Sequence, residues 1–146
     1  MLDFREDLKK LLEGITYTNE LNESKVINVY FETDRDEKGR IIFKTPALII
    51  RGISGTITPA SIGWNIYTSG SAVDVSLYLK VRSSDYDALT VRKEISDQLD
   101  ALIKANASSY AGLDYLKVSS VNDRDYIEEK GTLRRDFRIE GLIKEV

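Results

Sequence analysis

The sequence predicts an α+β fold, with one domain over residues 1–146, a mostly antiparallel sheet, a long helix packed on one face and a short N-terminal helix. The length of 146 residues suits a single hydrophobic core. Residues 73–81 alternate between apolar and polar side chains, which is typical of a half-buried strand. A stripe of apolar residues with helical spacing follows at once. This stripe comprises Ala88, Val91, Ile95, Leu99 and Leu102.

The N-terminal segment predicts the short helix. Asp3 and Glu6 have the spacing of a capping box, and Gly14 stands where such a helix would end. The residues expected to face the sheet are Phe4, Leu8, Leu11 and Leu12. The polar segment 18–25 then predicts a loop.

The next segments predict strands. Residues 26–33 and 41–44 are rich in β-branched and aromatic side chains, so we expect a hairpin across the charged turn between them. The unbroken apolar run 47–50 predicts a central strand that is covered on both faces. Glycines spread through residues 52–71 predict bends or bulges between short strands.

The C-terminal half continues with one helix and two strands. Ser84 or Asp85 is expected to cap a helix near residues 85–105. Strands are expected over residues 115–121 and 132–146, with a charged loop over 122–131 between them. In the last strand, alternation puts Leu133, Phe137 and Ile139 on one face and Arg134, Arg138 and two acids on the other.

Composition narrows the chemistry. The chain has no His and no Cys, which removes the most common bases, nucleophiles and soft metal ligands. We therefore expect that the chain is not an enzyme and that it has no catalytic residue, no metal site and no cofactor. The formal charge of −3 gives no general attraction to nucleic acid or to an anionic membrane. The acidic N-terminus and the absence of a long apolar run predict a cytosolic protein without a membrane segment.

Two carboxylate patterns have alternative interpretations. Residues 34–45 are similar to a calcium-binding loop, but Lys38 and Thr45 stand where oxygen ligands are needed, which favours a solvated hairpin tip. A carboxylate-based hydrolase would need at least two acidic side chains to converge in a cleft. The candidates for that cleft are Asp34, Asp36, Asp123 and Asp125.

Arginines in the final strand form another candidate site. Arg134, Arg135 and Arg138 flank Phe137, and this combination of side chains is suited to phosphate contact and base stacking. Asp136 shares a face with two of them, so cross-strand ion pairs or a subunit contact are favoured over nucleic acid. A small nucleic-acid-binding or ligand-binding module that uses this strand is the alternative function.

The order of elements carries a family resemblance. The apolar strand 46–51, the passage from strand to helix over 73–89 and the final strand 135–140 together resemble the tail-terminator or tail-completion proteins of long-tailed phages and prophages. The resemblance implies a homo-oligomeric ring, commonly a hexamer, that caps the tail tube, stops its growth and contacts tail-tube and head-completion proteins. It also implies a structural protein of the virion tail that is present in the host cytoplasm during assembly.

Such a ring needs contacts between unlike patches of neighbouring subunits. Exposed strand edges and the two charged loops are the expected sources of these contacts. The residues predicted to interact are Asp34, Arg35, Asp36, Lys38, Arg40, Asp123, Arg124, Asp125, Arg134 and Arg138.

Overall fold

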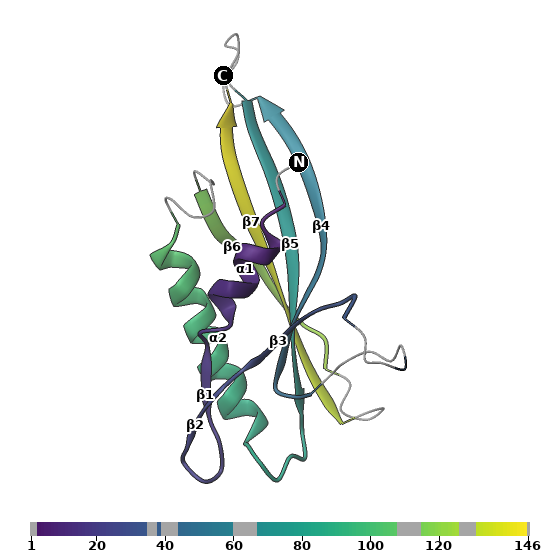
Figure 1. Cartoon of the computed structure of the whole chain (residues 1–146), viewed down its shortest axis with the longest axis vertical. Coiled ribbons are helices and arrows are strands. Elements are labelled where there is room, and N and C mark those ends of the chain that lie inside the picture. Colours follow the sequence, from purple (N-terminus) through teal and green to yellow (C-terminus); the bar gives the residue numbers. More distant parts are fainter. Residues whose placement is uncertain are drawn as a thin grey trace.

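The computed structural model describes residues 3–34, 38, 44–59, 67–107, 115–125 and 131–145. Within these residues the chain forms two helices and seven strands, and most strand pairs are antiparallel (Figure 1). The α+β class is confirmed, although the main helix, with 18 residues, is of moderate length. The elements are α1 (Arg5–Leu12), β1 (Thr16–Thr18), β2 (Ser24–Val26), β3 (Asn28–Phe31), β4 (Ala47–Pro59), β5 (Tyr67–Lys80), α2 (Ala88–Ala105), β6 (Tyr115–Asp123) and β7 (Thr132–Glu145).

Five strands form the main sheet in the order β3-β4-β5-β7-β6. The β3–β4 pair is parallel and the other pairs are antiparallel. Strands β5 and β7 pair along their whole lengths, from Tyr67 opposite Glu145 to Lys80 opposite Thr132. The predicted strands near residues 73–81, 115–121 and 132–146 are therefore confirmed. The long strand β6 forms one edge of the sheet.

Both helices pack on one face of this sheet. The odd-numbered residues of β5 from Val73 to Leu79 are fully buried and belong to the same core cluster as Leu8 and Leu12 of α1. The buried residues of α2 are Ala88, Val91, Ile95, Leu99 and Ile103. The predicted last position, Leu102, is partly buried and packs against the same core, while its neighbour Ile103 is the last fully buried residue of α2. Helix α2 contacts β6, β1, β5 and α1, so its covered stripe is wider than one row of side chains.

Both predicted helix caps differ from the structure. The N-cap of α2 is Asp87, whose carboxylate accepts a 3.1 Å hydrogen bond from the Thr90 amide, and neither Ser84 nor Asp85 takes that place. At α1 the N-cap is Phe4, with no side-chain cap. Because Phe4 is drawn into the core, Asp3 lies one residue too early and instead accepts hydrogen bonds from the amide and guanidinium of Arg5. The predicted capping box does not form.

The predicted loop over 18–25 is partly strand. Strands β1 and β2 pair as an antiparallel hairpin that runs from Thr16 to Val26 and so takes in both ends of this segment. The side-chain amide of Gln98 on α2 accepts a hydrogen bond from the Thr16 amide and donates one to the Thr16 carbonyl, which attaches the hairpin to α2. The predicted hairpin arm over 41–43 lies outside the described residues, and β3 pairs in parallel with β4.

The glycine-containing region is more regular than predicted. It forms the C-terminal part of β4 and the N-terminal part of β5, and the pairing of these long strands has one register shift, between Ile50 and Ile53. Residues 60–66 lie outside the described part of the chain. The prediction of short strands is therefore wrong, whereas the predicted bulge is confirmed by this register shift. The predicted burial of 47–50 on both faces is confirmed, since every residue of the run is buried. Figure 1 shows β4, β5 and β7 extending beyond the two helices.

Candidate functional site

Polar side chains gather on the outer face of the main sheet, the face turned away from α1 and α2. Cross-strand register places Ser76 of β5 opposite Asp136 of β7, and Asp136 opposite Asn122 of β6. In a neighbouring row, Arg138 of β7 lies between Asp74 and Ser120. The sheet therefore brings together residues from three separate parts of the sequence.

These rows surround a hollow of about 450 Å³, which we call the arginine hollow. Its lining contains four arginines, two aspartates and two neutral polar residues. They are Arg51, Asp74, Ser120, Asn122, Arg124, Arg134, Asp136 and Arg138. In a chain with a formal charge of −3, guanidinium groups outnumber carboxylates at this place.

Asp136 is the centre of the polar contacts in the hollow. Its carboxylate accepts hydrogen bonds from the Ser76 hydroxyl at 2.7 Å and from Arg134 Nε at 2.8 Å, and it lies 3.2 Å from Arg124 Nε. Burial acts to raise the pKa of Asp136, but the hydrogen bonds and the two guanidinium charges outweigh it, so the pKa is lowered. The carboxylate is therefore ionised near neutral pH and holds two arginines in place.

The other two arginines have looser contacts. Arg51 lies 3.6 Å from Glu32, the residue that follows β3, and donates to the Tyr78 hydroxyl at 3.4 Å, while Arg138 lies 3.6 Å from Asp74. The side chains of Arg138 and Arg124 are 44% and 54% exposed. Exposed pairs of this kind exchange easily with water or with another charged group. The hollow thus has a fixed centre at Asp136, which holds Arg134 and the exposed Arg124, and a looser pair between Arg138 and Asp74.

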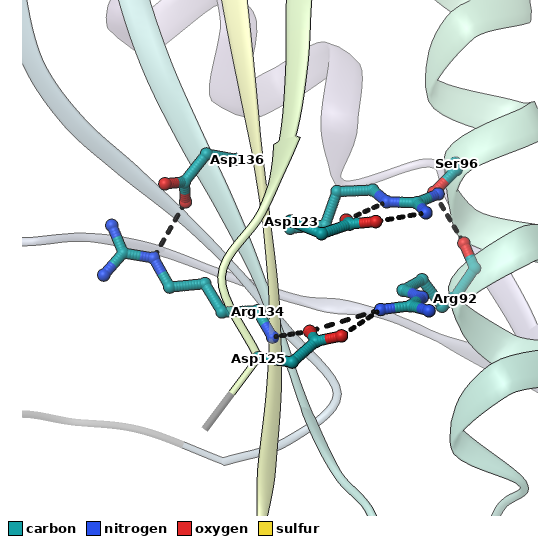
Figure 2. Close-up of polar contacts among 7 residues, drawn as sticks. Arg92, Ser96, Asp123, Asp125, Arg134 and Asp136 are labelled. Carbon is teal, nitrogen blue, oxygen red and sulfur yellow. Dashed lines mark hydrogen bonds and ion pairs between the residues drawn. The ribbon is translucent and has the colours of Figure 1, made fainter. Parts of the chain in front are cut away.

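A second set of ion pairs lies toward α2 (Figure 2). Asp123 accepts hydrogen bonds from Arg135 at 2.7 and 3.1 Å, and Arg135 also donates to Ser96 of α2. The hydrogen bond from Arg135 lowers the pKa of Asp123. Asp125 pairs with Arg92 of α2 at 3.2 Å and accepts from the Arg134 amide. These carboxylates attach the ends of β6 and β7 to the helix.

The predicted interaction residues therefore divide into groups. Arg124, Arg134 and Arg138 converge on the arginine hollow, whereas Asp123 and Asp125 form the helix-side pairs. Asp34 accepts a hydrogen bond from the Phe31 amide and Lys38 is exposed, and neither lines the hollow. The rest of that loop, Arg35, Asp36 and Arg40, lies outside the described residues.

Sequence patterns left three important members of the site unassigned. Arg51 lies on β4, and Asp74 and Ser76 lie on β5. All three are far in sequence from the site arginines at positions 124, 134 and 138. The alternation of β5 predicted that Asp74 and Ser76 share a polar face. It carried no information on which residues of β7 lie opposite them, because register is a long-range property.

The two carboxylates at the centre of these networks are poorly suited to act as general acids. A general acid needs a raised pKa, and the guanidinium neighbours of Asp123 and Asp136 have the opposite effect. Among the described residues, no group of three acidic side chains is placed to hold a metal ion. Within the same residues, no helix has the length and apolar character needed to cross a membrane.

Comparison of the sequence with protein-family models and with curated proteins finds no match.

Proposed function

We propose that this chain is a structural assembly protein of a long-tailed phage or prophage, which forms an oligomeric ring that caps the tail tube and takes part in joining head to tail. The proposal rests on the resemblance of the order of elements to tail-terminator proteins. In this reading the chain acts by contact between subunits and with tail-tube and head-completion proteins.

One structural observation supports the proposal, namely that no other strand of the described residues pairs with the outer edge of β6, beside the charged outer face of the sheet. Strand β6 is an edge strand of nine residues, and its Tyr115 and Val121 are 44% and 52% exposed. Long open edges promote pairing with other chains, and proteins that remain monomeric usually shorten or cover them. Aromatic residues and arginines are also enriched where proteins meet.

Electron microscopy and sedimentation of the purified chain test this function. We expect closed rings with a central opening, either in the chain alone or after addition of a tail-tube protein from a neighbouring gene, where one is found. Genes for capsid, portal and tail-tube proteins around this gene would support the same conclusion. Absence of rings under both conditions, together with a gene neighbourhood without virion genes, would overturn the proposal.

The arginine hollow favours a second candidate, a module that binds nucleic acid or a small anionic ligand. Four guanidinium groups in one hollow can contact phosphate oxygens in pairs. Asp74 and Asp136 in the same hollow oppose a polyanion, which is why this function ranks second. A nucleic-acid gel shift that weakens as the salt concentration rises would support this function. Absence of binding even at low salt would contradict it.

A further inference from the structure

Strand β4 continues well beyond the end of its neighbour β3. The parallel pairing of these two strands ends with Phe31 opposite Ile50. From Ile53 to Pro59, β4 pairs with β5 on one side, and no strand of the described residues pairs with its other side, which we call the β4 edge. Figure 1 shows this part of β4 at the margin of the sheet, beyond β3.

The outer side of β6, which we call the β6 edge, is the other long open stretch of the main sheet. Strand β6 has nine residues, and within the described part of the chain it pairs only with β7. Strand β3 is also at a margin, but it has four residues and its Phe31 amide donates to the Asp34 carboxylate. The β4 edge and the β6 edge are therefore the stretches best able to accept a further strand.

Hydrogen bonds show which backbone groups of β6 face outward. The Arg124 amide donates to β7, so alternation turns the backbone groups of Val121 away from β7. Ahead of the bulge in β6, the Leu116 amide donates to a carbonyl beyond the end of α2, so Val118, two residues later, also faces outward. Since the Leu116 amide is already bonded, the stretch available for pairing begins at Val118.

The β4 edge has a matching pattern. The Ile50 carbonyl accepts a hydrogen bond from the Glu32 amide and therefore points toward the side of β3. The bulge that follows shifts the alternation by one residue, so the backbone groups of Ile53 and Gly55 face the open side. Both edges thus carry outward donors and acceptors at regular intervals.

Direction and face also agree when a second copy stands beside the first in the same orientation. The pairs β4–β5, β5–β7 and β7–β6 are all antiparallel, so β4 and β6 run in opposite directions. Strand β6 of one copy is then antiparallel to β4 of the next. Ile53 and Val118 both pack against the helix-side core, and Val121 lies opposite the buried Phe137, so all three belong to the same face.

We propose that the β6 edge of one copy pairs with the β4 edge of the next copy, so that the main sheet continues from subunit to subunit. The inference rests on the proposed function and names the contact through which ring subunits meet. Val121 lies opposite Ile53 of the next copy, Val118 lies opposite its Gly55, and Ser120 lies beside its Ser54. A contact between unlike edges of identical chains is heterologous, and such contacts close into rings when the rotation permits.

The bulge of β6 is compatible with this pairing. On its inner side, Val118 and Val121 lie opposite Ile139 and Phe137, which are only two residues apart on β7. Ile53 and Gly55 of β4 have the same spacing. A regular strand can therefore span the bulge on the outer side as β7 does on the inner side.

The exposed side chain of Val121 selects the register. In the proposed register Val121 is covered by Ile53, and β-branched residues directly opposite each other stabilise a sheet. A shift by two residues would place Val121 opposite Gly55, which has no side chain to cover it. A shift by one residue would turn the helix-side residues of one strand to the outer face of the joined sheet.

Cysteine cross-linking tests the contact directly, since the chain has no Cys of its own. Ser54→Cys marks the β4 edge and Ser120→Cys marks the β6 edge, and both serines are exposed. Within one chain β5 and β7 separate these positions by about 14 Å, which is too far for a disulfide. A chain with both cysteines can therefore be linked only to other chains.

We expect mild oxidation of the chain with both cysteines to give a series of disulfide-linked multimers that ends in a closed ring. In a mixture of the two single variants, the mixed dimer should exceed a control dimer by about tenfold, the factor that two backbone hydrogen bonds provide. The control replaces Ser120→Cys by Ser84→Cys, at an exposed serine in the loop before α2. Non-reducing electrophoresis measures the yields.

A charge placed on the β6 edge should abolish the cross-link. Lysine on an edge strand opposes pairing with another strand, so adding Val121→Lys to the Ser120→Cys chain should reduce the mixed dimer to the control level. Adding Leu89→Lys, at an exposed apolar position on α2, should leave the yield unchanged. Both side chains are exposed in the single chain, so neither change should disturb its fold.

The outcomes separate this inference from the proposed function. If the unmodified chain forms rings but the marked pair gives no excess dimer, the joined edges are wrong and the proposed function stands. If either single variant dimerises with itself more than with the other, like edges meet and the inference is overturned. Excess mixed dimer without rings, in a gene neighbourhood without virion genes, would support the edge contact and overturn the proposed function.

Discussion

The two faces of the main sheet are stabilised in different ways. On the helix side, fully buried apolar side chains of β5 meet those of α1 and α2 in one continuous cluster. On the outer face, Ser76 is equally buried, yet it lies in a network of hydrogen bonds and ion pairs around Asp136. The helix side therefore determines whether the chain folds, while the outer face is held by specific polar contacts around Asp136.

Removal of one core side chain should have the largest effect. Leu77→Ala leaves a cavity among residues that are fully buried, and such changes cost about 2–5 kcal/mol of unfolding free energy. Urea denaturation followed by circular dichroism measures this loss. A cost below about 1 kcal/mol would show that the helix side is not the main source of stability.

The centre of the outer face should rank next. Asp136→Asn removes the charge that holds Arg124 and Arg134, and loss of such a partly buried partner costs about 1–3 kcal/mol. Asp74→Asn is the matched control, because the Asp74 side chain is 49% exposed and its pair should contribute less than about 1 kcal/mol. Equal effects in the two variants would contradict the view that Asp136 is the centre of the network.

The same network predicts a dependence on pH. The pKa of Asp136 is lowered from the ordinary value of 3.8, so its contribution is fully present above that value and is lost as the pH falls through the folded-state pKa. Unfolding free energy measured from pH 6 down to pH 2 should therefore fall below about pH 3.8, and it should fall less steeply in Asp136→Asn. If the unfolding free energy fell equally steeply with pH in the unmodified chain and in Asp136→Asn, Asp136 would not be the cause of the pH dependence.

The two faces also differ in how far the sequence predicted them. Helical spacing identified four of the five buried residues of α2, and strict alternation identified the buried side of β5, because both signals repeat locally. The arginine hollow depends on register between β4, β5, β7 and β6, which local pattern does not encode. Three of its four arginines were predicted from the charged loop and the final strand, whereas Arg51 was missed.

The predictions of the two helix N-caps were wrong for a related reason. Asp3, Ser84, Asp85 and Asp87 are all suitable capping residues by type. Burial of Phe4 and of Ala88 decides where each helix begins, and burial is a tertiary property. Local chemistry thus offered several starting points, and core packing selected one.

The cap of α2 provides a smaller test on the helix side. Asp87→Ala removes the hydrogen bond to the Thr90 amide and should lower the melting temperature by about 2–4 °C. Ser84→Ala is the control, because Ser84 lies outside the helix and should leave the melting temperature unchanged. A larger loss in Ser84→Ala than in Asp87→Ala would mean that α2 begins earlier in solution.

The smallest effect is expected for the shortest ion pair on the exposed side of α2. Lys93 and Asp97 approach to 2.6 Å, closer than Arg124 and Asp136, but their side chains are 79% and 65% exposed. Water competes with such a pair and the long lysine side chain loses freedom in forming it, so Lys93→Ala should change the unfolding free energy by less than about 0.5 kcal/mol. Urea denaturation of Lys93→Ala and of Asp136→Asn under the same conditions compares the two losses of unfolding free energy directly. If the two variants lose similar stability, separation rather than burial governs the strength of ion pairs in this protein, and the distinction drawn for the outer face fails.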